Sequence, residues 1–468
     1  MANIIKSLQK QYSGKKVLVV GLGLQGGGAG VAKFFAELGA VVTVTDKKTE
    51  EQLADSIKYL DKVPITFHLG GHQQEDFINT DMIFKGPSVP WDLPEIVAAE
   101  KKGIPVEMEL SFFAANSLAK IIGITGTRGK STTTQMIFTL LQNSNYPVYL
   151  AGSLPGISTI NLLKTLKSTD WVVMELPSWP LSGFHRKMIS PHIAVFTNFY
   201  PDHLNYYKNM DDYLYDKEAI FMYQREGDFL IINKNWEYIT DSSTQFLSHE
   251  SLTSTLTGLS EVKKIAFDSS VISFSADDFP AELQFLKGEH NKENAAAALA
   301  VGKVLGLDVN NCINIISQFK GLPFRQEIVG QKDNVIFVND TTSTTPVATI
   351  KALDTFTDKP VYLMLGGQGK NLPYDALINQ LIKAKKIILL KGSFTDEILP
   401  LLKEKYADMI TPVHDDMRKA VAEAYRLAKN DTGGAYVLFS PGATSFAMYD
   451  NEFHRGREFN KIVHDLIQ

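Results

Sequence analysis

The chain has 468 residues, of which 44% are hydrophobic and 21% charged, and its formal net charge at pH 7 is −5. A chain of this length is too long to fold around one hydrophobic core, and about three domains are expected. The lack of an excess of basic residues argues against nucleic acid as a partner. The single cysteine, Cys312, excludes an intrachain disulfide framework and a cysteine metal cluster, as is typical of a reducing compartment. Without a long apolar run or a signal-peptide core, we expect a cytoplasmic protein with no membrane partner.

The first part of the chain predicts strands at 16–24 and 41–46 with a helical segment between them. GLGLQG (21–26) satisfies G-x-G-x-x-G after a strand, and Asp46 ends the next strand. This spacing is compatible with NAD(P), with another phosphate-bearing ligand or with a purely structural turn. A phosphate-bearing ligand other than NAD(P) is favoured, because the extra glycines after residue 26 would widen the turn.

Residues 121–134 (IIGITGTRGKSTTT) predict a nucleotide triphosphate site. An apolar strand leads into a glycine turn, and Lys130 and Ser131 open the next helix. Backbone N–H groups and the helix end point to one spot, Lys130 adds a charge for phosphate oxygens, and the Ser131 hydroxyl can reach Mg²⁺. The fit to G-x-x-x-x-G-K-[ST] is imperfect, because its first glycine would fall on Ile124. The alternative is an ordinary glycine turn before a surface helix.

Three further groups of the second part are candidates for the same site. Glu175 ends the apolar run 171–176, where it should face the phosphate loop and offer oxygen to Mg²⁺. His203 follows the run 193–198 and could bind a second metal, act as a base or, as is slightly favoured, cap a turn. Lys217 lies on an apolar helical stripe, from which a lysine usually extends to water. Burial would instead lower its pKa, and the neutral amine could then form a carbamate with carbon dioxide.

The third part predicts another strand and helix series. Its turns NDTTSTT (339–345), LGGQGK (365–370) and SPGATSF (440–446) each follow a strand. They offer hydroxyls, backbone amides and Lys370 at one sheet edge, a set that suits an anionic ligand such as an amino-acid carboxylate.

Strand and helix signals alternate almost throughout, which predicts an α/β fold with largely parallel sheets. We expect three domains: a Rossmann-like N-terminal domain (1–117), a central P-loop ATPase-like domain (118–320) and a Rossmann-like C-terminal domain (321–468).

These motifs together resemble the Mur ligase family, from the GLGLQG turn to RGREF (455–459). TGTRGKS (125–131) is similar to the family's form of the phosphate loop, which accounts for the misfit at Ile124. The other segments that carry the resemblance are MELPSW (174–179), YPDH (200–203), YDKEAIF (215–221), GEHNKEN (288–294) and LPFRQE (322–327).

The resemblance implies an ATP-dependent ligase of peptidoglycan precursor synthesis. Its implied substrates are UDP-N-acetylmuramoyl-L-alanine (UDP-MurNAc-L-Ala) and glutamate, in its D form, joined through an acyl phosphate. The implied cofactors are ATP, two Mg²⁺ ions and a carbamylated lysine, and the implied state is a monomer.

The resemblance also implies a role for individual residues. The catalytic residues would be Lys130, Glu175, His203 and Lys217, and the metal ligands would be Ser131, Glu175, His203 and Lys217 as its carbamate. The residues implied to bind ATP are Gly126, Thr127, Arg128, Gly129, Lys130, Ser131, Thr132, Asn291, Asn294, Arg325 and Asp340. Those implied to bind the acceptor are Gly23, Leu24, Gln25, Gly26, Asp46, Lys47, Ser153 and Ser178. Those implied to bind glutamate are Thr344, Lys370 and Ser445.

The chain departs from the family pattern at several positions. Pro177, Ser178 and Pro180 stand where Ser-Ser and a later Gln are usual, Ser153 replaces an asparagine, and Thr342 replaces a lysine. KGPSVP likewise replaces a Ser-Pro-Gly form. These departures keep open a related Mur-type or folylpolyglutamate-type ligase with an altered substrate, or a nucleotide-binding homologue with reduced activity. An NAD-dependent oxidoreductase would leave the phosphate loop, Glu175 and Lys217 without a role.

Overall fold

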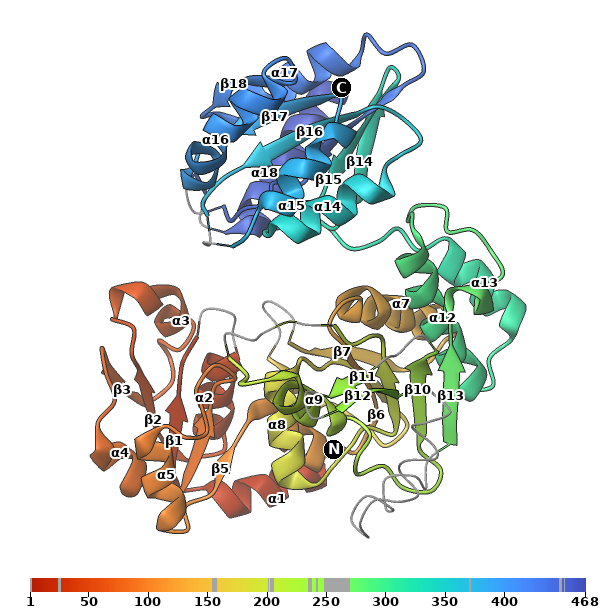
Figure 1. The fold of residues 1–468 in the computed structure, drawn as a ribbon. Helices are drawn as coiled ribbons and strands as arrows, with labels where there is room; N and C mark the ends of the chain where they lie inside the picture. The colour runs from red at the N-terminus through yellow and green to blue at the C-terminus, as the bar shows by residue number, and fades with distance from the viewer. Residues whose placement is uncertain are drawn as a thin grey trace. The chain divides into compact units, whose positions relative to one another are not determined.

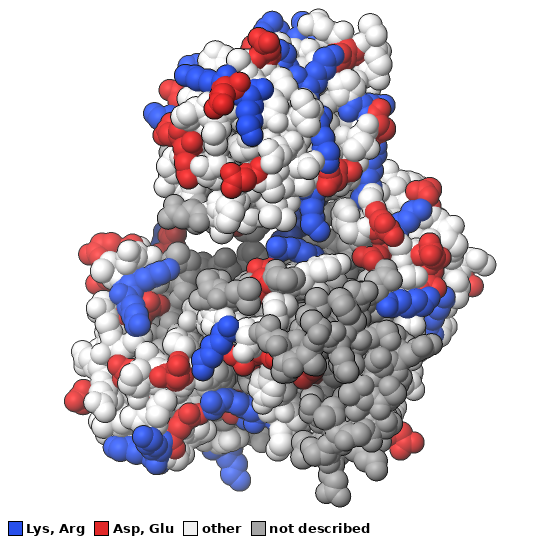
Figure 2. All heavy atoms as spheres, in the orientation of Figure 1, with Lys and Arg blue, Asp and Glu red and all other residues white. Residues whose placement is uncertain are grey.

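The computed structural model describes residues 2–23, 27–153, 158–200, 202, 206–234, 238–240, 243–247, 270–369, 372–445, 448–449 and 451–468. The chain divides into two compact units, one of residues 1–281 and 292–316 and the other of residues 282–291 and 317–468. Within the described residues, no helix has both the length and the apolar character needed to span a bilayer. On the face drawn in Figure 2, basic and acidic side chains are interspersed over both units.

The first unit contains a five-stranded parallel sheet of order β3-β2-β1-β4-β5. The order reverses direction between β1 and β4, as in Rossmann-like folds, whose ligands bind at this switch point. Its strands are β1 (Lys16–Val20), β2 (Val41–Asp46), β3 (Ile65–Leu69), β4 (Met82–Lys85) and β5 (Val106–Glu107). Its helices are α1 (Ala2–Tyr12), α2 (Gly27–Glu37), η1 (Glu51–Leu53), α3 (Ala54–Lys58), α4 (Gln74–Ile78), α5 (Pro94–Lys101) and α6 (Glu109–Asn116).

The same unit contains a six-stranded parallel sheet of order β13-β10-β9-β6-β8-β7, in which β6 lies between β9 and β8. Strands β10 and β13 lie side by side in Figure 1. Its strands are β6 (Lys120–Thr125), β7 (Val148–Gly152), β8 (Trp171–Glu175), β9 (Ile193–Phe196), β10 (Phe229–Asn233) and β13 (Ser270–Phe274), and β11 (Tyr238–Thr240) and β12 (Ser243–Leu247) form a separate antiparallel pair. The helices of this part are α7 (Lys130–Asn143), η2 (Thr159–Lys164), α8 (Ser178–Lys187), α9 (Met210–Glu218), η4 (Ala276–Asp278), α12 (Glu289–Val304) and α13 (Val309–Ser317). The first three residues of α12 and the last residue of α13 belong to the second unit.

The second unit contains a six-stranded sheet of order β14-β15-β19-β16-β17-β18, parallel except for β14. Alternate residues of β16 enter different cores, since Leu363 and Leu365 pack on one face and Tyr362 and Met364 on the other. Helices α14 to α16 cover the first face and α17 and α18 cover the second (Figure 1). The strands are β14 (Glu327–Lys332), β15 (Val335–Asn339), β16 (Val361–Gly366), β17 (Lys386–Leu390), β18 (Ile410–His414) and β19 (Ala435–Phe439). The helices are α14 (Pro346–Thr355), α15 (Asp375–Gln380), η5 (Leu381–Lys383), α16 (Ser393–Tyr406), α17 (Met417–Ala428) and α18 (Glu452–Ile467).

The predicted α/β fold with three mainly parallel sheets is confirmed. A feature that the sequence did not predict is that the first two sheets share one hydrophobic core. Phe34 of α2, Phe112 of α6 and Ile160 of η2 all belong to it. The close approach of α2 to η2 depends on Gly30, because a Cβ there would lie 1.8 Å from the Ser158 Oγ atom.

Gly123, in the middle of β6, provides a test of this packing. A Cβ at Gly123 would lie 2.4 Å from Pro191 Cγ and 2.9 Å from Leu176 Cδ1. We expect Gly123→Ala to lower the free energy of unfolding of the first unit by about 1–3 kcal/mol through overpacking. Gly433→Ala, in open space in the second unit, is the control. Thermal unfolding measures both, and an unshifted transition in the Gly123 variant would contradict the packing described.

Candidate active site

The phosphate loop between β6 and α7 requires glycine at two positions. Gly126 has φ of +144° and Gly129 has φ of +80°, backbone conformations that other residues rarely adopt. A Cβ at Gly126 would lie 2.0 Å from Thr197 Oγ1, and one at Gly129 would lie 2.3 Å from Asn294 Oδ1. The glycine spacing that differs from the general pattern therefore fits this loop.

The loop is held by the chain that follows the neighbouring strand β9. The Thr127 N–H donates to the Asn198 carbonyl at 2.9 Å, and the Arg128 N–H donates to Asn198 Oδ1 at 2.8 Å. The Thr197 hydroxyl donates to the Arg128 carbonyl at 2.6 Å. Arg128 also forms an ion pair with Asp202 at 3.3 Å. The adjacent candidate His203 lies outside the described residues.

Lys130 begins α7 and folds back over the loop. Its Nζ donates to the Gly126 carbonyl at 3.0 Å and to the Thr127 carbonyl at 3.1 Å. Ser131 and Thr132 follow in the first turn of α7 and are partly exposed. The positive end of α7, the Lys130 ammonium and the Ser131 hydroxyl thus lie at one place, as a phosphate ligand requires.

Glu175 ends β8, the strand beside β6, and its side chain is buried. Its Oε2 atom has no hydrogen-bond partner among the described residues. A buried carboxylate oxygen without a donor is costly, and a cation would satisfy it. Together with the Ser131 hydroxyl, Glu175 fits the oxygen ligands that Mg²⁺ prefers. Within the described residues, no group of three His, Cys, Asp or Glu side chains is placed to hold a metal.

Lys217, on α9, is buried and does not extend to water. Its Nζ donates to the Gly126 carbonyl at 2.9 Å and to Thr125 Oγ1 at 3.4 Å. Burial, reinforced by the nearby Lys130 ammonium, holds the pKa of Lys217 well below its usual value, against the opposing effect of two aspartates. A fraction of neutral amine therefore lies directly beside the phosphate loop, as carbamate formation requires.

The two candidate asparagines of α12 make different contacts. Asn294 accepts a hydrogen bond from Thr133 Oγ1 at 3.1 Å and lies against Gly129, so it borders the phosphate loop. Asn291 lies in the segment assigned to the second unit, where its amide donates to the Lys287 carbonyl at 2.7 Å.

In the first sheet, Asp46 braces the glycine turn. Its Oδ2 accepts from the Leu22 N–H and its Oδ1 from the Lys48 N–H, both at 2.9 Å. The Gly23 carbonyl accepts from the Ser56 hydroxyl at 2.7 Å, and Lys47 is exposed. The candidates Leu24, Gln25 and Gly26 lie outside the described residues.

The other two acceptor candidates, Ser153 and Ser178, follow the carboxyl ends of the neighbouring strands β7 and β8. The Ser153 N–H donates to the Glu175 carbonyl at 3.1 Å, so its loop begins beside the buried carboxylate. Ser178 is buried at the first position of α8, preceded by Pro177. Pro177 and Pro180 fall where helix N–H groups have no partner within the helix, which explains how α8 tolerates both departures from the family pattern.

In the second unit, Asp340 is buried just beyond β15. Its Oδ2 accepts from Ser343 Oγ at 2.6 Å and Ser440 Oγ at 2.8 Å, and its Oδ1 accepts from the Gln326 N–H at 3.2 Å. Burial raises the pKa of Asp340 to about 6, although these three bonds act in the opposite direction.

The segment that carries Arg325 is joined to the Asp340 turn. Arg325 is exposed, between Phe324 and Gln326, which have φ of +67° and +50°. The Thr342 hydroxyl donates to the Phe324 carbonyl at 2.8 Å. The threonine that replaces the family's lysine therefore fixes the shape of the arginine segment.

The glutamate candidates also follow adjacent strands. Ser445 is buried after β19, and its Oγ atom has no hydrogen-bond partner among the described residues. Thr344 follows β15, which pairs with β19. Gln368 pairs with Thr444 and so brings the turn after β16 beside Ser445. Lys370 lies outside the described residues.

Sequence reasoning missed two buried titratable groups near the candidate acceptor loops. Lys85 ends β4; its Nζ donates to the Val89 carbonyl at 2.8 Å, and burial lowers its pKa to about 7. Asp216 accepts from the Tyr207 hydroxyl at 2.8 Å, and burial raises its pKa to about 6. The only available signals were a lysine directly after an apolar strand and an acid beside Lys217.

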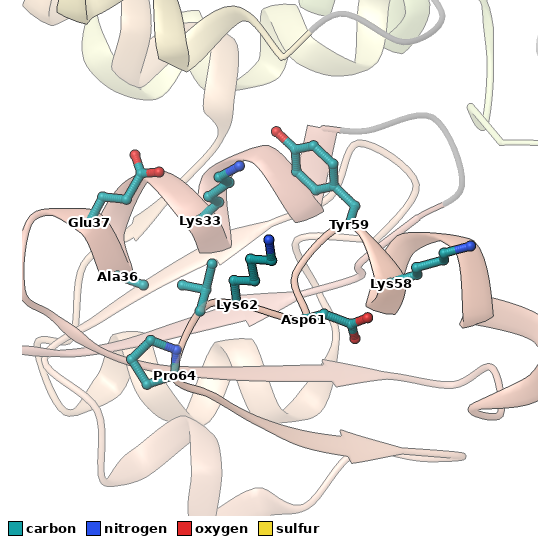
Figure 3. A pocket seen from close by; sticks show the side chains of 9 residues that line it. Lys33, Ala36, Glu37, Lys58, Tyr59, Asp61, Lys62 and Pro64 are labelled. Atoms are coloured by element: carbon teal, nitrogen blue, oxygen red, sulfur yellow. The ribbon is translucent and has the colours of Figure 1, made fainter.

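The first unit also has a surface hollow of about 560 Å³. It is bounded by α2 and the segment from Lys58 to Pro64, and Figure 3 shows Lys33, Lys62 and Tyr59 around it. No candidate site residue lines it.

Two family models match the chain. Residues 15–107 match the Mur ligase MurD-like N-terminal domain, and residues 124–302 match the Mur ligase middle domain. Among curated relatives, the UDP-N-acetylmuramoylalanine–D-glutamate ligase of Roseiflexus sp. (strain RS-1) is 35% identical, covering 97% of this chain and 99% of the relative. The enzyme of the same name from Clostridioides difficile (strain 630) is 33% identical, with coverage of 97% and 99%.

Solved structures share the fold at lower identity. The UDP-N-acetylmuramate–alanine ligase MurC of Thermotoga maritima matches with a TM-score of 0.55 and 19% identity, covering 96% of this chain and 99% of that structure. MurF of Acinetobacter baumannii matches with a TM-score of 0.55 and 15% identity, covering 97% and 91%. Lys130 and Lys217 both donate to the Gly126 carbonyl of the phosphate loop, within the region that matches the middle-domain model. The two domain matches and the similarity to the curated relatives over almost the whole chain show that the chain belongs to the Mur ligase family.

Proposed function

We propose that this chain joins D-glutamate to UDP-MurNAc-L-Ala at the expense of ATP, in the synthesis of peptidoglycan precursors. The observation that carries the proposal is the buried Lys217 amine, which donates to the Gly126 carbonyl of the phosphate loop, next to the strand that ends at the buried Glu175. The substrates are those in the names of relatives that align along almost the whole chain.

The proposed reaction has two steps. The carboxylate of the alanyl end attacks the γ-phosphoryl group of ATP, which gives an acyl phosphate and ADP. The amine of glutamate then attacks the acyl carbon, so that an amide bond forms and phosphate and a proton leave. The first step brings two anions together, and the Lys130 ammonium and the amides at the start of α7 supply compensating positive charge.

Glu175 and Ser131 would hold one Mg²⁺ ion, and we further propose that His203 and carbamylated Lys217 hold a second. These ions would neutralise charge on the phosphates. Asn294, which borders the loop, and Asn291, Arg325 and Asp340 would contact the nucleotide, with Gly126 to Thr132 around its phosphates.

We propose the domain division 1–117, 118–320 and 321–468, for the acceptor, ATP and glutamate respectively. Acceptor contacts would come from Gly23 to Gly26, Asp46, Lys47, Ser153 and Ser178, and glutamate contacts from Thr344, Lys370 and Ser445. The enzyme would act as a cytoplasmic monomer. The buried Ser445 hydroxyl, which has no hydrogen-bond partner among the described residues, supports a polar ligand at its position.

A single assay tests the proposal. The purified chain is incubated with ATP, Mg²⁺ and UDP-MurNAc-L-Ala, with D-glutamate or L-glutamate in parallel, and phosphate and the coupled product are measured. We expect both only with D-glutamate. Absence of product with either isomer would refute the proposed function.

Lys130→Ala should abolish product formation. It removes the charge that the γ-phosphoryl group meets, and we expect a loss of at least about a thousandfold in turnover. Lys120→Ala is the matched control, because Lys120 is exposed at the opposite end of the same strand β6. Phosphate release by the Lys130 variant at the wild-type rate would contradict the role of Lys130.

Carbamylation of Lys217 predicts dependence on carbon dioxide. Because the pKa of Lys217 is lowered, its neutral form is present at pH values where an ordinary lysine is protonated, and that fraction grows as the pH rises through the lowered pKa. We expect activity to fall in carbon dioxide-depleted buffer and to recover with bicarbonate. With ¹³C-labelled bicarbonate, a carbamate NMR signal should appear in the wild type and be absent from Lys217→Met. Full activity without carbon dioxide, and no such signal, would exclude the carbamate.

A further inference from the structure

A tight turn of residues 86–89 follows β4, next to the point where the strand order of the first sheet reverses. The Val89 N–H donates to the Gly86 carbonyl at 3.1 Å, and Pro87 takes the second position of the turn, which its fixed φ favours. Pro87 and Ser88 are exposed, so a ligand can reach the tip of the turn. Because ligands of Rossmann-like folds bind at this reversal, the turn belongs to the edge proposed for the acceptor.

The turn also packs against the residues that directly follow β1. The Gly86 N–H donates to the carbonyl of Val20, the last residue of β1, at 2.8 Å. Gly21 has φ of +90°, and a Cβ built there would lie 3.5 Å from Val89 Cγ2 and 3.9 Å from the Gly86 Cα. The turn after β4 and the beginning of the glycine turn after β1 are therefore in van der Waals contact.

Lys85, the last residue of β4, closes the turn from its buried side. Its Nζ donates to the Val89 carbonyl at 2.8 Å and, at the longer distance of 3.5 Å, to the Gly86 carbonyl. These are the last and the first carbonyl groups of the turn. One ammonium group therefore joins the two ends of the turn, and an apolar side chain at this position would leave the Val89 carbonyl without its donor.

The indole ring of Trp91 contacts the Lys85 ammonium and connects it to α8. The Lys85 Nζ atom lies 4.3 Å from the ring centroid, and the guanidinium carbon of Arg186 on α8 lies 3.7 Å from it. Trp91 Nε1 donates to the Oγ atom of Ser182, also on α8, at 2.8 Å. Because α8 begins at Ser178, a proposed acceptor contact, these bonds join the turn to the second part of the acceptor site.

A methionine could fill the position of Lys85 at a lower energetic cost. The side chain is buried, and burial lowers the pKa of Lys85 to about 7; the Arg186 guanidinium acts in the same direction and Asp216 in the opposite one. No carboxylate of the described residues forms an ion pair with the ammonium. Such a buried charge contributes little net stability, but it specifies geometry through the acceptors that it binds.

We propose that Lys85 is a positioning residue for the acceptor, which holds the turn of residues 86–89 in the shape that contacts UDP-MurNAc-L-Ala. The inference rests on the proposed function and deepens it. Trp91 supports the same turn, because it contacts the ammonium and joins it to α8. The contacts of Lys85 include neither the phosphate loop (126–132) nor a glutamate candidate, so its effect should be confined to the acceptor.

Steady-state kinetics of Lys85→Met test the proposal. Methionine has a similar length but no donor, so the KM for UDP-MurNAc-L-Ala should rise about tenfold, as the loss of a charge-assisted hydrogen bond predicts. The turnover at saturating acceptor and the KM values for ATP and D-glutamate should stay within about twofold of wild type, because the phosphate loop is untouched. The melting temperature should not fall, since a buried charge is replaced by an apolar group.

Two variants of Trp91 provide a second measurement. Trp91→Ala removes both the ring beside Lys85 and the bond to Ser182, and it should also raise the acceptor KM selectively. Trp91→Phe keeps an aromatic face for the ammonium and should restore most of the wild-type value.

Lys16→Met is the matched control. Lys16 is exposed at the opposite end of β1, the strand that pairs with β4, and its replacement should leave all three KM values unchanged. An unchanged acceptor KM in Lys85→Met and Trp91→Ala, or an equal rise in all three KM values, would overturn the proposal while leaving the proposed function intact. A wild-type enzyme that neither binds nor converts UDP-MurNAc-L-Ala would overturn both.

Discussion

The first unit depends on one constraint: the chain between β6 and α7 must pass through two left-handed turns where there is no room for a Cβ. Gly126 and Gly129 meet it, and four neighbouring residues contact their loop. Asn198 and Thr197 bond to its backbone, Asn294 packs against Gly129, and the Lys217 amine donates to the Gly126 carbonyl. A change in the loop would therefore displace all of them together.

The buried polar groups of both units share a common arrangement. Glu175, Asp340 and Ser445 all lie just at or beyond the carboxyl end of a strand in a parallel sheet, where ligands bind in α/β proteins. Two of them have an atom without a partner among the described residues, and the pKa of Asp340 is raised by burial. Such groups are costly when the protein is alone, and they are the ones that a ligand can satisfy.

Most of the fold and part of the site could be predicted from the sequence, because local patterns determine both. Apolar runs predicted the strands, and the glycine turn with Lys130 predicted the phosphate loop. Lys217 stood out because a lysine on an apolar stripe is unusual. The hydrogen bond from the Ile160 N–H to Glu109 could not be predicted, since it joins residues about fifty positions apart in sequence. The same holds for Thr342, whose bond to Phe324 appears only once the chain has folded.

The folded-back position of Lys130 has a consequence for the energetics of ligand binding. Its ammonium is already held by the Gly126 and Thr127 carbonyls, so the loss of side-chain freedom, up to about 2 kcal/mol for a lysine, is incurred during folding. An arriving phosphate exchanges one set of oxygen partners for another and does not have to order a mobile chain. The backbone of the loop therefore preorganises Lys130 for its ligand. The gain in binding free energy depends on how much more strongly the Lys130 ammonium bonds to phosphate oxygens than to peptide carbonyls.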